Sequence, residues 1–102
     1  MREKRQHVRT PVRFKVVCAQ EGAADIEAEA RDLSMGGMFV ESSTMPAFGA
    51  AVTMVVEGMA ARVVRLPATV RWTMPEGFGV QFGLLGAFET HALVNFMKKQ
   101  KP

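Results

Sequence analysis

The sequence has a single cysteine, Cys18, so no disulfide can form within the chain. A lone cysteine is typical of a reducing compartment, and we expect Cys18 to be a small core residue. Apolar stretches are short, because Glu57, Arg62 and Arg65 interrupt them well before the roughly 20 residues that a membrane-spanning helix needs. No apolar segment follows the charged first residues, which argues against a secretory signal. These absences predict a cytoplasmic protein that does not insert into a membrane.

Groups suited to catalysis or metal binding are also few. His7 and His91 have no cysteine or carboxylate partners at the spacing of metal ligands. The sequence shows no nucleophile–base pair and no pair of carboxylates placed for acid–base catalysis. We therefore expect no metal site, no cofactor and no enzymatic activity, but a domain that presents a binding site.

The size and composition predict one folded domain over residues 1–102. A chain of 102 residues leaves no room for a second hydrophobic core. With 48% apolar and 23% charged residues, it resembles folded domains rather than disordered segments.

The charge is distributed unevenly along the chain. Residues 1–15 contain six basic residues and one acid, whereas residues 16–97 contain four arginines and nine acids, a net charge of −5. Proteins that follow a nucleic-acid backbone normally spread positive charge along a groove. The pattern favours a basic arm that grips a small anion, with no binding to DNA or RNA. A small barrel that binds nucleic acid is the less favoured alternative.

Alternating apolar and polar residues, typical of half-buried strands, recur through most of the chain. Turn-forming segments divide the pattern into six stretches, at 13–20, 25–32, 37–42, 51–58, 59–74 and 78–82. The fifth stretch is long, and Pro67 cannot donate a ladder hydrogen bond, so we expect a sheet edge, a bulge or a break there. Its alternation predicts that Trp72 and Met74 share one face with Ala68 and Val70.

The period of the pattern changes near the end of the chain. Phe88, Ala92 and Phe96 recur at helical spacing, and Lys98 and Lys99 suit the C-terminus of a helix. Short strands with close turns favour a closed barrel, which leaves no sheet edge free. We expect an all-β fold with a six-stranded antiparallel β-barrel over 12–84, a C-terminal α-helix over 86–100 and a flexible basic N-terminal arm over 1–11.

The expected arm carries Arg5 and Arg9 in the stretch RQHVR. Residues four apart share a face in a helical turn and in an extended strand, so both side chains can converge on one ligand. A guanidinium group has a planar fork of donors that matches phosphate oxygens and the O6/N7 edge of guanine. Taken alone, the pair would be interpreted as a solvated basic tail.

The stretch DLSMGG places a carboxylate, a hydroxyl and two glycines at one corner between strands. Asp32 can accept hydrogen bonds from the N1–H and N2–H groups of guanine, and Ser34 can donate or accept. Gly36 and Gly37 permit a positive φ and a close approach of the backbone to a ligand. The plainer interpretation is turn chemistry, because Asp and Ser bond their own backbone in tight turns. Together with the arm, these groups are complementary to a guanine nucleotide that carries phosphate.

The stretch KRQHVR, with 22 residues between it and DLSMGG, resembles the paired signature of PilZ domains, RxxxR and [D/N]xSxxG. The resemblance extends to ATVRW, GFGVQF and the closing helix, and covers nearly the whole chain. It implies a β-barrel that binds cyclic di-GMP, a bacterial second messenger. It also implies that Arg5 and Arg9 contact the phosphates and guanine edges. Asp32 and Ser34 would then hold a guanine, and Gly37 would keep the turn open.

Four further residues are possible ligand contacts. Arg13 is the fallback for the second arginine, because RTPVR also fits RxxxR. Lys4 can reach a phosphate as a point charge but lacks the flat fork of arginine, and it slightly favours two bound nucleotides over one. Gly36 lies at the corner. Trp72 is expected in the core or at the barrel rim, with contact to a base as the less favoured alternative.

The resemblance implies a sensor that passes its signal to an unidentified effector protein, as a monomer or a ligand-linked dimer. Ordering nine arm residues costs on the order of 10 kcal/mol, at about 1–2 kcal/mol each. Five or six charge-assisted hydrogen bonds, at roughly 1.5–3 kcal/mol each, offset that cost. We therefore expect the arm to order on ligand binding. The alternative is a PilZ-like protein-interaction adaptor that does not bind the nucleotide.

Overall fold

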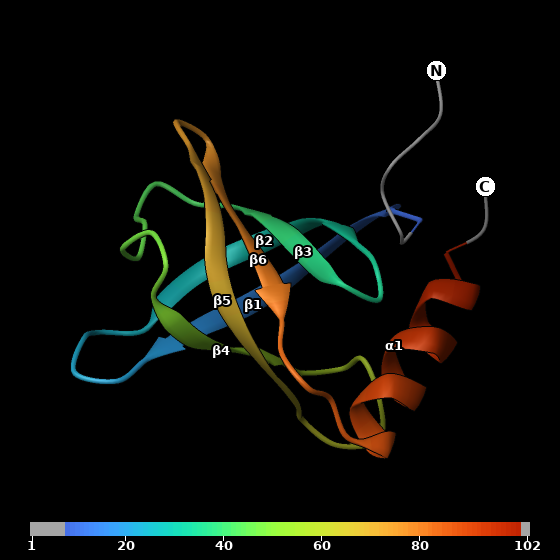
Figure 1. The fold of residues 1–102 in the computed structure, drawn as a ribbon. Coiled ribbons are helices and arrows are strands. Elements are labelled where there is room, and N and C mark those ends of the chain that lie inside the picture. Colours follow the sequence, from blue (N-terminus) through green and yellow to red (C-terminus); the bar gives the residue numbers. More distant parts are fainter. Residues whose placement is uncertain (1–7, 101–102) are drawn as a thin grey trace.

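A computed structural model describes residues 8–100, which form six β-strands and one α-helix. The strands are β1 (Thr10–Gln20), β2 (Ile26–Leu33), β3 (Gly37–Glu41), β4 (Ala51–Val56), β5 (Val64–Met74) and β6 (Gly77–Phe82), and the helix is α1 (Ala87–Lys98). The strand pairings are antiparallel, and the sheet closes on itself in the order β1-β2-β3-β6-β5-β4 (Figure 1). The expected six-stranded antiparallel β-barrel with a C-terminal helix is confirmed.

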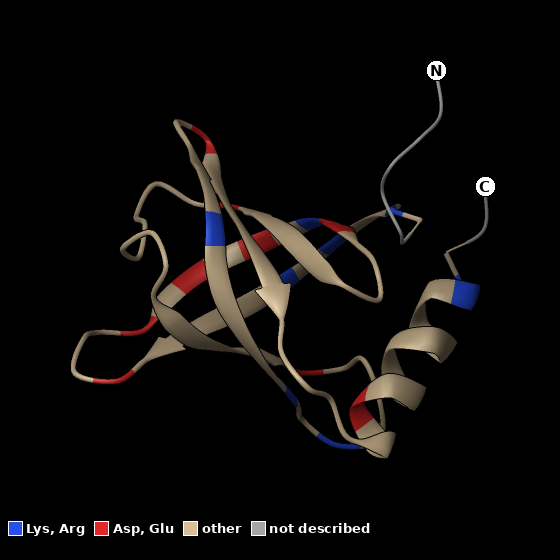
Figure 2. Cartoon of the chain, in the orientation of Figure 1, with Lys and Arg blue, Asp and Glu red and all other residues tan. Residues whose placement is uncertain are grey.

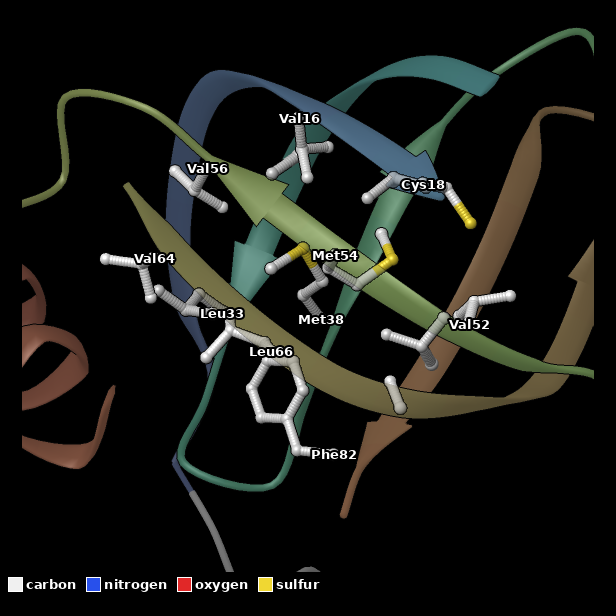
Figure 3. Packing of buried hydrophobic residues seen from close by; sticks show 14 of the residues in the cluster. Val16, Cys18, Leu33, Met38, Val52, Met54, Val56, Val64, Leu66 and Phe82 are labelled. Carbon is white, nitrogen blue, oxygen red and sulfur yellow. The ribbon is translucent and has the colours of Figure 1, made fainter. Parts of the chain in front are cut away.

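Apolar side chains from alternate strand positions fill the interior of the barrel. In β4, Val52, Met54 and Val56 are 5%, 0% and 1% exposed, whereas Thr53 and Val55 between them are partly exposed. Figure 3 shows side chains of this cluster gathered between the strands, with Cys18, Leu33, Met38 and Leu66 among those labelled. Alternation with a period of two therefore describes most of the barrel core, as the sequence predicted.

One interruption of the alternation lies in β2. Its pairing with β3 passes from Ala30 to Asp32 against two consecutive residues of β3, and Arg31 is the extra residue. Such a bulge turns the residue that follows it to the other face of the sheet. Ala30 is fully buried, but Asp32 lies on the outer face of the barrel with its side chain 32% exposed.

A second bulge lies in β5. Its pairing with β6 passes from Val70 to Trp72 against two consecutive residues of β6, and Arg71 is the extra residue. Val70 is fully buried, whereas Trp72 and Met74 are 47% and 46% exposed. The prediction that Trp72 and Met74 share the face of Val70 is therefore wrong, because the bulge reverses the direction of the later side chains.

The strand β5 continues through Pro67, which pairs with Thr53 of β4. The Pro67 carbonyl accepts a hydrogen bond of 2.8 Å from the N–H of Gly83, just after β6 ends. The proline nitrogen faces the same side as this carbonyl. Since β6 has ended there, the sheet needs no backbone N–H from residue 67. The register of β5 with β6 begins at Ala68, so Pro67 lies just beyond the end of that ladder, and the bulge of this strand lies at Arg71.

The helix α1 packs on one side of the barrel, where it contacts β5 and Phe14 of β1 (Figure 1). The ring centroids of Phe14 and Phe96 are 5.2 Å apart and the rings are nearly perpendicular, at 85°. The guanidinium carbon of Arg62 lies 4.1 Å from the centroid of the Phe88 ring, within the range of a cation–π contact. The observed helix falls within the expected range of 86–100.

The described part of the chain contains little of the expected arm. The strand β1 begins at Thr10, so residues 10 and 11 belong to the barrel. Residues 1–7 lie outside the described residues, and the flexibility of the arm stays a prediction. Within residues 8–100, no helix is both long enough and apolar enough to cross a membrane.

Candidate functional site

The corner between β2 and β3 is shaped by Ser34, which is 4% exposed. Its Oγ accepts hydrogen bonds from the backbone N–H groups of Gly36 and Gly37, at 3.1 and 3.2 Å. The backbone N–H of Ser34 donates to the Gly37 carbonyl at 2.9 Å, and the hydroxyl donates to the same carbonyl at 3.4 Å. These contacts match the plainer interpretation, turn chemistry. Direct contact between Ser34 and a ligand stays a prediction.

Gly37 is required by space rather than by backbone conformation. Neither Gly36 nor Gly37 has a positive φ, so the corner does not use the left-handed conformation that glycine permits. The backbones of β3 and β6 approach so closely that a Cβ on Gly37 would lie 2.1 Å from the carbonyl oxygen of Val80. The missing side chain therefore lets the corner lie directly against β6.

Arg9 and Asp32 form an ion pair beside this corner. Arg9 Nη1 lies 2.6 Å from Asp32 Oδ1, and the two side chains are 28% and 32% exposed. Pro11 of β1 faces Asp32 of β2, which brings Arg9, two residues earlier, next to the carboxylate. The guanidinium carbon of Arg9 also lies 5.9 Å from the centroid of the Trp72 ring, close enough for cation–π attraction. Arg9 thus lies between an acidic and an aromatic side chain.

Asp32 and Trp72 belong to one row of residues that crosses four neighbouring strands. Asp32 of β2 faces Phe39 of β3, Phe39 faces Gly79 of β6, and Gly79 faces Trp72 of β5. Residues directly opposite each other in antiparallel strands place their side chains on the same face. The two bulges complete the row, because they turn Asp32 and Trp72 to the outer face. We call these four residues the outer row.

An open pocket of about 900 Å³ lies over the outer row. This volume is within the range of pockets that hold small ligands in proteins. Six of the residues singled out from the sequence line it: Arg9, Asp32, Ser34, Gly36, Gly37 and Trp72. The structure therefore brings the arm arginine, the corner and the tryptophan to one place.

Other lining residues were missed by sequence reasoning, among them Met35, Phe39, Met74, Gly79 and Gln81. For Phe39 a signal existed, because it alternates with the buried residues Met38 and Val40 in the stretch GMFVE. Gly79 and Gln81 likewise alternate with the buried residues of GFGVQF. No comparable signal marks Met74, because its position depends on the bulge at Arg71.

Three of the predicted contact residues are not among the residues that line the pocket. Arg13 points elsewhere: its Nη1 lies 3.2 Å from Oε1 of Glu29 on the surface, and its side chain is 65% exposed. Lys4 and Arg5 lie outside the described residues. Within RTPVR, the geometry thus assigns to the pocket Arg9 and not Arg13.

Groups for metal binding or covalent chemistry do not gather in the described residues. Within residues 8–100, no three His, Cys, Asp or Glu side chains lie where they could hold a metal ion. Burial, and to a lesser extent the charge of Asp25, raises the pKa of the Cys18 thiol to about 11. A thiol that stays protonated at neutral pH is a poor nucleophile.

The pocket combines a cation, a carboxylate and the three aromatic rings of Phe39, Trp72 and Phe82. A carboxylate offers about four lone-pair positions, so Asp32 can accept N–H donors from a ligand while it stays bonded to Arg9. Arg9 has further N–H donors that can reach an anionic oxygen. The exposed ring of Trp72 offers a surface for stacking. The arrangement suits a planar heterocycle that has N–H donors and carries an anionic group.

Solved structures with the same fold support the observed topology. Bacillus subtilis inhibitor of motility (MotI/DgrA) has a TM-score of 0.72 at 22% identity, over 95% of this chain and 50% of that one. Borreliella burgdorferi PlzA, solved in complex with c-di-GMP, has a TM-score of 0.72 at 17% identity, over 92% and 41% of the two chains. The PilZ domain of CeSA from a cellulose-synthesizing bacterium has a TM-score of 0.72 at 18% identity, over 90% and 96%.

The first two of these proteins are longer, and this chain spans about half the length of the inhibitor of motility. A comparison with curated protein sequences finds no significant match. The sequence profile of the PilZ domain, by contrast, matches residues 3–98, which include both paired motifs, the six strands and the helix. The chain therefore belongs to the PilZ domain family.

Proposed function

We propose that this chain binds cyclic di-GMP in the pocket over the outer row. The observation that carries the proposal is the ion pair of Arg9 and Asp32 beside the exposed ring of Trp72. These residues supply a guanidinium donor, a carboxylate acceptor and a stacking surface to one open pocket. Family membership and the cyclic di-GMP complex of PlzA support the identity of the ligand.

In the proposed complex, Asp32 accepts hydrogen bonds from the N1–H and N2–H groups of one guanine. Arg9 donates to a phosphate or to the O6/N7 edge of a guanine. Trp72 stacks on a base, and Ser34 with Gly36 and Gly37 holds the corner in the shape that presents Asp32. Arg5 and Lys4 approach from the arm, which becomes ordered when the nucleotide binds.

We further propose that the bound state is recognised by an effector protein in the cytoplasm. The chain then acts as a sensor rather than as an enzyme, either as a monomer or as a ligand-linked dimer. The distribution of charge supports a small ligand over a nucleic acid. Figure 2 shows the Lys and Arg residues of the described part on several elements, with Asp and Glu residues between them, rather than gathered on one element.

Isothermal titration calorimetry with cyclic di-GMP tests the proposal. A net binding free energy near 8 kcal/mol corresponds to a dissociation constant of about 1 μM. Replacement of Arg9 or Asp32 by alanine removes charge-assisted hydrogen bonds of roughly 1.5–3 kcal/mol. We expect the affinity of each variant to fall about 10- to 150-fold. Circular dichroism establishes that each variant is folded.

Arg13→Ala is the matched control, because Arg13 is an arginine of the same segment whose ion pair lies outside the pocket. Its affinity should equal that of the wild type. The proposal is wrong if the folded wild type shows neither heat nor chemical-shift changes at tens of micromolar nucleotide. That result would favour the adaptor that works through protein contacts alone. The mass of the complex at saturation distinguishes one bound nucleotide from two.

A further inference from the structure

We propose that Gly79 is a positioning residue, which allows the Trp72 ring to lie against β6 as the floor of the ligand pocket. The inference rests on the proposed function, because it concerns how the same pocket receives a base. Gly79 is at the centre of the outer row, with Phe39 opposite it on one side and Trp72 on the other. It is buried, and its neighbours Phe78 and Val80 point into the barrel core.

The indole ring occupies the space that a side chain on residue 79 would need. A Cβ on Gly79 would lie 2.4 Å from Cε3 of Trp72 and 3.3 Å from both Cδ2 and Cζ3. These three atoms belong to the six-membered part of the indole, so this part of the ring covers the Cα of Gly79. Distances below 3.0 Å are essentially never observed for a real Cβ, and the ring of an alanine variant would have to move.

Backbone conformation does not explain this glycine. Gly79 does not have a positive φ, unlike Gly22, Gly49 and Gly58. An alanine would therefore fit the backbone, and its one clear conflict is with the Trp72 side chain. The glycine is thus required by the position of the ring.

The position of the ring matters because Trp72 is in contact with the sheet and yet 47% exposed. A flat aromatic surface held in place stacks on a base without first losing side-chain freedom. Stacking of one base on one aromatic residue changes affinity about 5- to 150-fold when the aromatic residue is removed. A Trp72 ring displaced by a methyl group at position 79 would lose this effect although Trp72 itself is unchanged.

The fluorescence of the single tryptophan of the chain reports the position of this ring directly. In ligand-free Gly79→Ala, we expect the Trp72 emission to shift to longer wavelength, because the ring leaves the sheet. For the same reason, acrylamide should quench the Trp72 fluorescence more strongly than in the wild type. We expect the affinity for cyclic di-GMP to fall about 5- to 150-fold, as in Trp72→Ala.

The double variant Trp72→Ala/Gly79→Ala separates a positioning role from a general structural role. If Gly79 acts through Trp72, the second substitution causes no further loss of affinity once the ring is gone. An equal loss of affinity in both backgrounds would overturn the inference. So would a Gly79→Ala variant with the emission and the affinity of the wild type.

Nuclear magnetic resonance of the wild type provides a test that needs no variant. The Gly79 α-protons should show upfield ring-current shifts and nuclear Overhauser contacts to the Hε3 proton of Trp72. The absence of both would overturn the inference, even if Gly79→Ala does not fold. If the contacts are present but cyclic di-GMP does not bind, the ring placement stands, whereas the proposed function and the role of Gly79 in binding fail.

Discussion

At the scale of single residues, Asp32 and Ser34 differ although they belong to the same short motif. The Ser34 hydroxyl is buried, and the backbone of its own turn occupies its hydrogen-bonding positions. The Asp32 carboxylate is one-third exposed, and one of its oxygens bonds Arg9. The sequence could predict that both residues belong to one corner. It could not predict this division, because the division depends on which side chain the bulge turns outward.

Cys18 leads to a prediction about pH. The pKa of its thiol is about 11 in the folded protein, against an ordinary value of 9.0. Between pH 9 and 11 the unfolded chain releases the thiol proton while the folded protein retains it. The free energy of unfolding should therefore fall across this window by up to about 3 kcal/mol. Below pH 9 the thiol is protonated in both states, and the folded protein keeps this stability in full. Urea denaturation at a series of pH values measures the decline.

The control for this prediction is Cys18→Ala, in which lysines still titrate but the thiol is absent. The variant loses some stability at every pH, because a buried sulfur is removed. The comparison therefore concerns slopes: the wild type should lose more stability than the variant between pH 9 and 11. Parallel curves would show that burial does not hold the proton on Cys18.

At the scale of elements, the sequence predicts strands better than it predicts faces. Alternation identified the six strands, because each strand has one buried face over most of its length, and helical spacing identified the helix. Most bounds agree to within three residues, but the fifth stretch began five residues before β5. The bulges at Arg31 and Arg71 left no such signal. Pairing with the neighbouring strand determines where an extra residue is accommodated, and the pairing is not visible in one strand's own sequence. Trp72 was therefore assigned to the wrong face, and no face was predicted for Asp32.

The close approach of β3 and β6 gives a prediction for Gly37→Ala. The added Cβ would lie 2.1 Å from a backbone carbonyl oxygen, which cannot move without disturbing the ladder of β6. We expect the free energy of unfolding to fall by about 1–3 kcal/mol or more. Urea denaturation monitored by circular dichroism measures the change.

Gly83→Ala is the matched control for stability. A Cβ at Gly83 would meet its nearest atom, the carbonyl oxygen of Pro67, at 3.8 Å, which is ordinary contact. Its φ is not positive, so alanine is compatible with the backbone. Its stability should stay within about 0.5 kcal/mol of the wild type. If the two variants had the same free energy of unfolding, the close approach of β3 and β6 at Gly37 would not require a glycine there.

At the scale of the whole molecule, the closed barrel with its packed helix was predictable from composition, strand number and turn spacing. The position of the pocket was harder to predict from the sequence. It lies across β2, β3, β6 and β5, which are adjacent in the barrel although β3 and β6 are far apart in the sequence. The paired motifs indicated that Arg9 and Asp32 meet. Nothing in the sequence alone indicated that Phe39, Gly79 and Trp72 continue the same row.

Ligand binding should raise the thermal stability of the whole domain. Cyclic di-GMP at 100 times its dissociation constant would stabilise the folded state by about 2.7 kcal/mol. For a domain of this size, that corresponds to a rise in Tm of roughly 10–20 °C. Scanning calorimetry measures the rise, and GMP at the same concentration is the control ligand. Asp32→Ala should show a much smaller rise at equal nucleotide concentration, and an unchanged Tm for the wild type would contradict binding.

The two bulges also affect how related barrels should be aligned. Each bulge adds a residue without adding a pair to the ladder, so a relative that lacks a counterpart of Arg31 or Arg71 would still present its next residue to the solvent. A deletion elsewhere in the same strand would instead turn that residue into the core. Residues around this pocket should therefore be aligned between related barrels by the residue that each faces on the neighbouring strand. Alignment by counting along the chain would pair a pocket-lining residue with a core residue.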